Sequence, residues 1–211
     1  MARDTEAQCR KCRRAMEKLF LKGDRCNGPK CAMIRRAYIP GVHGKKMSRG
    51  NRSEYGIQLA AKQKIKRIYG VMEKQFRKHF TDVSGKKGVT GDLLLVRLET
   101  RLDNVVYRMG FATSRAQARQ IVTHGLVSVN GKRMSIPSAE VKVGQVISIR
   151  DSKKEKNYFK NIEQALQNKQ DFPSWISFNP QKLEGTIVSL PVRDDIGINI
   201  DAQVVVEYYS R

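Results

Sequence analysis

The sequence predicts an α+β protein with a basic, metal-bound N-terminal extension, a helical domain, and a small module of two helices on an antiparallel sheet. All four cysteines lie within the first 31 residues, which are basic. Apolar residues then recur at spacings of three and four, which is typical of helices. Short stretches rich in Val and Ile follow, separated by turn-forming residues. We expect the three parts to span residues 1–45, 46–95 and 96–190.

Basic side chains are concentrated in the first part of the chain. The formal net charge is +21 at pH 7, from 41 Lys and Arg against 20 Asp and Glu. Residues 1–90 carry a net charge of +17, residues 91–150 carry +5, and residues 151–211 carry −1. Self-repulsion of this size destabilises the free compact state, and a polyanionic partner would relieve it. Nucleic acid is the first candidate partner, an anionic membrane surface is the second, and a merely solvated surface is the third explanation.

Membrane-spanning and export signals are not evident in the sequence. No run approaches the roughly 18 apolar residues of a membrane span, and the N-terminus lacks the apolar core of a signal peptide. We therefore expect a cytoplasmic protein that has no membrane partner.

The four cysteines follow the pattern C-x2-C-x13-C-x4-C, at Cys9, Cys12, Cys26 and Cys31. Two short-spaced pairs let four thiolates converge on one ion in a tetrahedron, which is typical of structural zinc. An iron–sulfur cluster also takes four thiolates and stays open as an alternative. Two disulfides are the other alternative, which a reducing cytosol disfavours. Because protein atoms would fill all four positions, we expect a structural metal rather than a catalytic one.

Two apolar stripes predict helices, the first in the second domain and the second at the start of the module. Ser53 can cap the first helix, and Gly70 is expected to divide the region into two. Because the members of each stripe share one helix face, we expect them to form the hydrophobic core rather than a platform for stacked bases. The first stripe consists of Ile57, Ala61, Ile65, Ile68, Met72, Phe76 and Phe80. The second runs from Asp92 to Gly110 and consists of Leu94, Leu98, Leu102, Val105 and Met109.

The module carries unusually complete local signals. Ser114 and Gln117 fit a capping box at a helix start, and Gly125 fits the left-handed residue that ends that helix. Asn130 and Gly131 tolerate positive φ and predict a tight hairpin turn after the strand 127–129. Further strands are expected at 141–143 and 146–150. Beyond the module's first sheet, a helix is expected at 158–168 and strands at 175–178, 185–190 and 204–209.

Arginines one turn apart indicate a binding face on the module. Arg115 and Arg119 repel each other by a few tenths of a kcal/mol in an isolated helix, and a phosphate bound between them would reverse that effect. Arg97, Arg101 and Arg108 share a face of the preceding helix if that helix is continuous. Arginine's planar fork suits phosphates and base edges, and the module could lie on the shallow minor groove, junctions or loops of RNA. A solvated arginine face is the alternative.

Several segments resemble one family closely. In the module they are Arg101–Phe111, Ser114–Gln120 and Val129–Lys132. Elsewhere they are the N-terminal cysteine region, Pro40–Gly44, Ser53–Gly56 and Val205–Arg211. Together they resemble the family of the fourth protein of the bacterial small ribosomal subunit, after which this RNA-binding module is named. The likeness runs through nearly the whole chain.

The resemblance implies a structural constituent of the small ribosomal subunit rather than an enzyme. Such a protein is a primary binder of small-subunit ribosomal RNA at a helical junction, nucleates assembly, and contributes to the mRNA entry region and translational accuracy. The implied partners are this RNA, neighbouring ribosomal proteins (notably the fifth of the small subunit), and mRNA as a further candidate. No small-molecule substrate is implied. By analogy, residues 191–211 pack back onto the helices of residues 46–95.

Charge and resemblance together select the candidate RNA contacts. They are Arg10, Arg13, Arg14, Arg35, Arg36, His43, Lys45, Lys46, Arg49, Arg97, Arg101, Arg108, Ser114, Arg115, Arg119, His124 and Lys132.

Two alternative functions compete with this one. A pseudouridine synthase can carry the same module, and Arg101-Leu102-Asp103 matches the tripeptide around the catalytic aspartate of such enzymes. However, the tripeptide lies at the start of the module, and about 60 residues after the module are too few for a catalytic domain. A stand-alone RNA-binding translational regulator is the second alternative.

Overall fold

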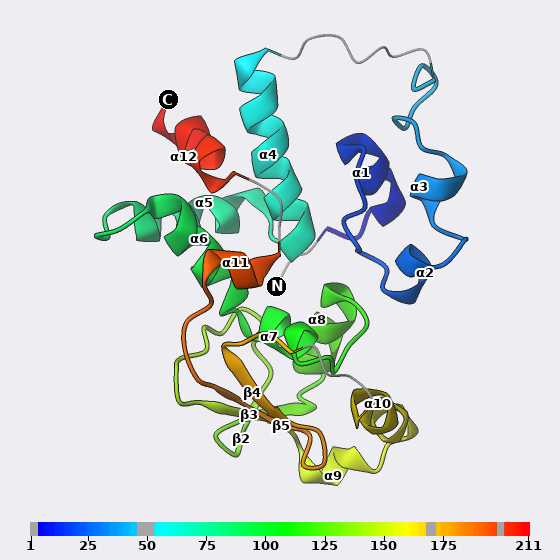
Figure 1. The fold of residues 1–211 in the computed structure, drawn as a ribbon, viewed down its shortest axis with the longest axis vertical. Coiled ribbons are helices and arrows are strands. Elements are labelled where there is room, and N and C mark those ends of the chain that lie inside the picture. Colours follow the sequence, from blue (N-terminus) through cyan, green and yellow to red (C-terminus); the bar gives the residue numbers. More distant parts are fainter. Residues whose placement is uncertain (1–3, 46–52, 168–171, 198–200) are drawn as a thin grey trace. The chain divides into compact units, whose positions relative to one another are not determined.

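The computed structural model describes residues 4–45, 53–167, 172–197 and 201–211, and it divides into two compact units (Figure 1). Unit 1 combines Met1–Leu94 with Ile198–Arg211, and unit 2 comprises Leu95–Gly197. The chain therefore leaves unit 1 within helix α6 (Thr90–Glu99) and returns to it near the C-terminus. None of the helices in the described ranges is long and apolar enough to cross a bilayer.

The regular elements described in unit 1 are helices. They are α1 (Gln8–Ala15), α2 (Asp24–Asn27), α3 (Ala32–Arg35), α4 (Glu54–Tyr69), α5 (Glu73–Ser84), the first half of α6, and α12 (Ala202–Ser210). The start of α4 is capped as predicted, because the Ser53 hydroxyl accepts a hydrogen bond from the Gly56 N–H at 3.3 Å. Gly70 ends α4 at φ +63°, in the left-handed region that glycine adopts most easily. The predicted division of this region into two helices is confirmed.

The strand expected at 204–209 is wrong, because this segment forms helix α12. An Asp201 carboxylate oxygen accepts a hydrogen bond from the Gln203 N–H at 3.0 Å and caps the helix start. Ala202 and Val205 are buried three residues apart, and α12 lies alongside α4 (Figure 1). A Cβ at Gly91 would lie 2.8 Å from the Ala202 Cβ, so glycine permits this close approach. Packing of an apolar face therefore outweighs the strand propensity of the valines.

Unit 2 is built on a five-stranded antiparallel sheet with the strand order β2-β1-β3-β5-β4. The strands are β1 (Val127–Val129), β2 (Lys132–Met134), β3 (Val146–Ile149), β4 (Ile176–Asn179) and β5 (Glu184–Ile187). The helices are α7 (Leu102–Arg108), α8 (Arg115–Thr123), α9 (Asp151–Lys154), α10 (Asn157–Gln167) and α11 (Arg193–Ile196). The α+β class is confirmed, although α10 adds to the two helices that were expected against the sheet.

One hydrophobic core joins the helices to one face of the sheet. Val105 and Val122 contribute from α7 and α8, while Val127, Ile147 and Ile149 contribute from the strands, and all five side chains are buried. Phe159 of α10 and Trp175 also belong to this core. This core fixes the position of α7 and α8, which carry most of the arginines predicted in the module.

The helix expected from Asp92 to Gly110 is interrupted. α6 ends at Glu99 and α7 begins at Leu102, because Arg101 is extended and pairs with Glu140 in an isolated bridge. The strand expected at 141–143 does not form, and the Val141 N–H donates to the Thr100 carbonyl at 2.9 Å beside this bridge. As a consequence, Arg97, Arg101 and Arg108 do not share one face of a continuous helix.

The segment that returns to unit 1 begins later than the expected residue 191. Helix α11 belongs to unit 2, where the Ile196 carbonyl accepts a hydrogen bond from Arg108 Nη2 at 2.7 Å. The Ser174 hydroxyl also lies 2.8 Å from an Asp195 carboxylate oxygen. These contacts hold residues 191–197 in unit 2.

The turn signals of the module are confirmed, with one difference at the capping box. Gly125 has φ +65°, and Asn130 and Gly131 have φ +49° and +75°. The Ser114 hydroxyl accepts a hydrogen bond from the Gln117 N–H at 3.3 Å. The Gln117 side chain, however, accepts from the Thr113 N–H at 2.9 Å rather than from that of Ser114.

Candidate nucleic-acid interface

A buried carboxylate, Glu99, lies at the junction of α6 and α7 and gathers two cations and an amide. Its side chain is 0% exposed. Arg108 holds it with two hydrogen bonds, from Nε to Oε2 at 2.8 Å and from Nη2 to Oε1 at 2.7 Å. Asn104 Nδ2 donates to the same Oε2 at 2.6 Å. This bidentate geometry is the strongest form of the arginine–carboxylate pair.

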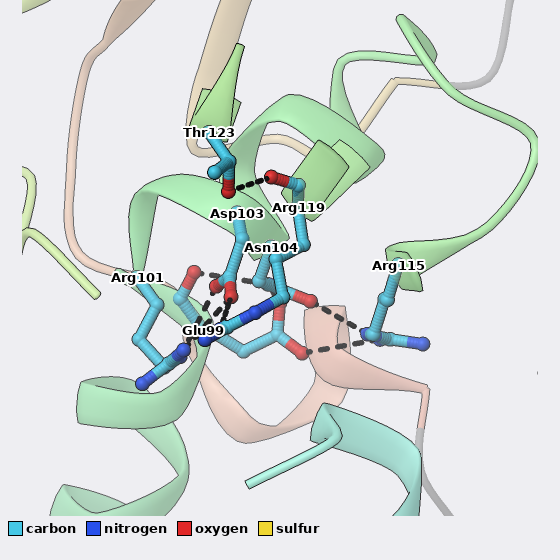
Figure 2. A network of polar contacts seen from close by, with 7 residues as sticks. All are labelled: Glu99, Arg101, Asp103, Asn104, Arg115, Arg119 and Thr123. Atoms are coloured by element: carbon cyan, nitrogen blue, oxygen red, sulfur yellow. Dashed lines mark hydrogen bonds and ion pairs between the residues drawn. The ribbon is translucent and has the colours of Figure 1, made fainter. Parts of the chain in front are cut away.

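A second buried carboxylate, Asp103, is held by two further arginines (Figure 2). Arg101 donates from Nε to Oδ1 at 3.1 Å and from Nη2 to Oδ2 at 2.8 Å. Arg119 of α8 donates from Nη1 to Oδ2 at 3.0 Å. Asp103 and Arg101 are each 5% exposed. The pair therefore ties α8 to the start of α7 inside unit 2.

Asn104 connects the Glu99 site to Arg115. The Asn104 Oδ1 accepts a hydrogen bond from Arg115 Nε at 2.7 Å, while its Nδ2 donates to Glu99 (Figure 2). Arg115 Nη2 also lies 3.8 Å from Glu99 Oε1, and its guanidinium stacks 4.6 Å from the centre of the Tyr107 ring. Each of these neighbours of Arg115 is supplied by α6 or α7.

Four of the predicted RNA contacts therefore have partners within the protein. Arg115 and Arg119 were predicted to be neighbouring positive charges relieved by a phosphate, and that premise is wrong because the two arginines bind different internal groups. Glu99, Asp103 and Asn104 were missing from the predicted site. The only sequence signal for them is that they alternate with arginines along residues 97–108, and contacts between helices cannot be deduced from that alternation alone.

The remaining predicted contacts differ in exposure. Arg13 is held by the Tyr38 carbonyl, which accepts from Nε at 2.9 Å, and by the Tyr38 ring. Ser114 acts as a helix cap, and Arg97 is half-buried. Lys46 and Arg49 lie outside the described residues. The exposed members are Arg10, Arg14, Arg35, Arg36, His43, Lys45, His124 and Lys132.

The four cysteines are free thiols in the described extension, three of them buried. Burial raises the pKa of the Cys12 thiol, a hydrogen bond from the Leu19 backbone opposes that shift, and the charges of Cys26, Cys9 and Cys31 raise the pKa further. The Lys22 N–H donates to Cys26 Sγ at 3.3 Å. Within the described ranges, however, no three Cys, His, Asp or Glu side chains are arranged so that they could hold a metal ion.

Comparisons with known proteins agree along the whole chain. Residues 3–99 match the family described as Ribosomal protein S4/S9 N-terminal domain, and residues 100–147 match the S4 domain. The chain is 51% identical to the small ribosomal subunit protein uS4 of Syntrophomonas wolfei and 52% identical to that of Ruminiclostridium cellulolyticum. It is 49% identical to uS4 of Solidesulfovibrio magneticus. Each comparison covers 100% of both chains. The chain therefore belongs to the uS4 family of small ribosomal subunit proteins.

Proposed function

We propose that this chain is a structural constituent of the small ribosomal subunit in the cytoplasm and a primary binder of small-subunit ribosomal RNA. The observation that carries the proposal is the distribution of charge, with a net +17 in residues 1–90. In the described extension, Arg10, Arg14, Arg35 and Arg36 are exposed. Basic side chains that release counterions from phosphates supply most of the affinity of such a protein.

The S4-domain module would then supply shape recognition. Its α7 and α8 are tied together by the Arg119–Asp103 ion pair and by a hydrogen bond from Arg115 to Asn104, so the module can present one fixed surface to RNA. A compact pair of helices on a sheet cannot enter the deep major groove of A-form RNA, but it can lie on a minor groove or a helical junction. Binding at such a junction would nucleate subunit assembly. In this proposal the chain lies near the mRNA entry region and contributes to translational accuracy. Its expected neighbours are the fifth small-subunit protein and mRNA itself.

An enzymatic function is not supported by the family or by the candidate catalytic residue. The uS4 family is structural and non-enzymatic. Asp103, the candidate aspartate of the pseudouridine synthase alternative, is buried and bound by both Arg101 and Arg119. A carboxylate held in this way is committed to structure, so the aspartate has a structural explanation that requires no catalysis.

The proposal is tested by titrating the full chain against the 5′ region of small-subunit ribosomal RNA and against a shuffled RNA of equal length across a salt series. Both RNAs bind at low salt, because phosphate contacts alone lose about a thousandfold or more in affinity between roughly 50 and 200 mM salt. We expect tight binding to persist above this range for the ribosomal RNA only. Equal, salt-sensitive binding of both RNAs would contradict the proposal and favour a stand-alone RNA-binding regulator.

We further propose that Cys9, Cys12, Cys26 and Cys31 hold one structural zinc ion. The proposal is supported by the chemistry of the donors, because the four thiols are unpaired, their spacing forms two short pairs, and Cys26 Sγ receives a backbone N–H hydrogen bond. The described side chains are not themselves arranged around an ion. When bound, zinc would link four thiolates and stabilise the extension by roughly 10–16 kcal/mol of apparent folding energy. An iron–sulfur cluster is the alternative cofactor.

Elemental analysis of the purified chain tests the metal proposal, with Cys26→Ser as the variant. We expect about one zinc per chain, lost in the variant and on treatment with a strong chelator. Iron with sulfide and visible absorption would identify the cluster instead. Two disulfides in place of metal would appear as the loss of all four free thiols on titration with a thiol reagent.

A further inference from the structure

Two arginines outside the predicted site converge on Gly125, the residue that follows His124 at the end of α8. A Cβ at Gly125 would lie 2.5 Å from Arg133 Nε and 2.8 Å from Arg133 Nη2. The Arg133 guanidinium therefore packs directly against the Gly125 backbone. Arg150 Nη1 donates a hydrogen bond to the Gly125 carbonyl at 3.2 Å. One glycine thus brings two guanidinium groups together from β2 and from the end of β3.

The sheet register places both arginines on the face away from the hydrophobic core. Ser128 of β1 lies opposite Arg133 on one side and opposite Ser148 on the other. Side chains alternate between the faces of a strand, and Ile149, which precedes Arg150, is buried in the core. Arg150 therefore shares the outer face with Arg133. Neither residue was selected from the sequence, because only the register and the turn bring them together.

These two arginines have no carboxylate partner among the described residues, in contrast to the arginines bound to Glu99 and Asp103. Asp151 directly follows Arg150 in the sequence, but it pairs with Lys154 at 2.8 Å. The partial negative charge at the C-terminus of α8 favours cations at this position. It does not neutralise two full charges, so the pair retains a field that attracts an anion.

We propose that Arg133 and Arg150 form a phosphate-binding site for the RNA backbone at the Gly125 turn, which rests on the proposed RNA-binding function. Two planar guanidinium groups can share one phosphodiester through charge-assisted hydrogen bonds. Exposed Lys132 and His124, which precede Arg133 and Gly125 in the sequence, extend the positive surface. The alternative role for the two arginines is only to cap the carbonyls at the end of α8.

The test uses the full chain with Arg133→Ala, Arg150→Ala and Lys142→Ala. Lys142 is exposed in the turn before β3, whereas Arg150 follows the opposite end of that strand, so its replacement removes one charge away from the site. Affinity for the ribosomal RNA fragment is measured across a salt series. We expect each arginine variant to lose about fivefold in affinity near about 150 mM salt and to lower the salt slope by about one phosphate. The lysine variant should match the parent.

Several outcomes would overturn the site. Unchanged slopes in both arginine variants would leave the residues as helix caps, and an equal loss in Lys142→Ala would mean that net charge alone is measured. The Arg133 side chain makes no hydrogen bond among the described residues, so its variant remains informative even if Arg150→Ala fails to fold. A parent that cannot distinguish ribosomal from shuffled RNA would instead contradict the proposed function. A discriminating parent with unaffected variants would contradict only this site.

Discussion

Unit 2 contains two sets of arginines in opposite surroundings. The paired set surrounds two buried carboxylates and consists of Arg101, Arg108, Arg115 and Arg119. The unpaired set meets at the Gly125 turn and consists of Arg133 and Arg150. In the formal net charge of the sequence, each arginine of either set counts as one positive charge. The fold therefore determines which arginines have an internal carboxylate partner and which do not.

Burial also separates the energetic roles of the two sets. Breaking a buried ion pair by removing one partner leaves an uncompensated charge and costs several kcal/mol. Removing Arg133, which is exposed and has no carboxylate partner among the described residues, changes stability little, but it removes a counterion-releasing contact with a polyanion. Arg150 is half-buried and donates to the Gly125 carbonyl, so its removal also costs one hydrogen bond. We therefore expect the paired set to control the free energy of unfolding and the unpaired set to control the salt dependence of RNA binding.

The largest expected effect is the loss of Glu99. Replacing this fully buried carboxylate by Ala removes the ion-pair partner of Arg108 and the side-chain acceptor of Asn104, and should lower the free energy of unfolding by about 3–5 kcal/mol. Urea denaturation measures the change. The control is Glu54→Ala, whose carboxylate is 77% exposed in its pair with Arg211 and should matter by less than about 1 kcal/mol. Equal losses in both variants would remove burial as the distinguishing factor.

A closer comparison pairs Arg119→Ala with Arg133→Ala. The first leaves Asp103 with Arg101 alone, so we expect a stability loss of about 1–3 kcal/mol and an unchanged salt slope. The second should change stability by less than about 0.5 kcal/mol and lower the salt slope. Urea denaturation and RNA titration of the same preparations measure both quantities. If Arg119→Ala lowers the slope while stability is kept, the paired set also contacts RNA.

The third prediction concerns the glycine that positions the unpaired set. Ala at Gly125 must adopt φ near +65°, which costs roughly 1–2 kcal/mol, and its Cβ would displace the Arg133 guanidinium. Gly144→Ala is the matched control, because Gly144 has φ +83° and a Cβ there would have no neighbouring atom within 4 Å among the described residues. Both variants should lose similar stability, whereas only Gly125→Ala should weaken RNA binding. Equal RNA affinities would show that the position of Arg133 is unimportant.

Local signals in the sequence predicted local structure well. The cap at Ser53, the helix end at Gly70 and the hairpin at Asn130-Gly131 each depend on one or two residues whose conformational preferences act within a few positions. The α+β class followed from the same signals. The charge distribution and the cysteine spacing likewise needed only the order of residues, because both are properties of the chain rather than of its packing.

Tertiary contacts account for what was not predicted. α12 is helical because Ala202 and Val205 bury against other helices, and valine content alone could not indicate that. The break after Glu99 depends on a bridge to Glu140, far along the chain. Similarly, the two sets of arginines differ only in which carboxylates the fold brings to them. The sequence therefore identified the basic residues, but it did not indicate which of them pair with carboxylates in the folded protein.

The smallest expected effect concerns Glu73, where burial and the number of hydrogen-bond donors can be compared as determinants of how much a carboxylate contributes to the free energy of unfolding. Glu73 in unit 1 resembles Glu99 in having several donors: Lys62 Nζ at 2.8 Å, Lys66 Nζ at 3.0 Å and the Tyr209 hydroxyl at 2.8 Å. Unlike Glu99, its side chain is 44% exposed. Partial burial raises the Glu73 pKa, but the hydrogen bonds from these donors outweigh it and lower the pKa from 4.5 to about 2.

Because the folded pKa lies below the unfolded value, Glu73 stabilises unit 1 above about pH 4.5 and loses that contribution as the pH falls toward about 2. Solvent screening at this exposure limits the effect to about 1 kcal/mol. Urea midpoints of the parent and Glu73→Gln, measured at steps between these pH values, should converge as the pH falls. Glu54→Gln should show no such convergence, because its carboxylate is largely exposed. If the Glu73 difference instead equals the loss in Glu99→Ala, the number of paired donors rather than burial determines the stability of such sites.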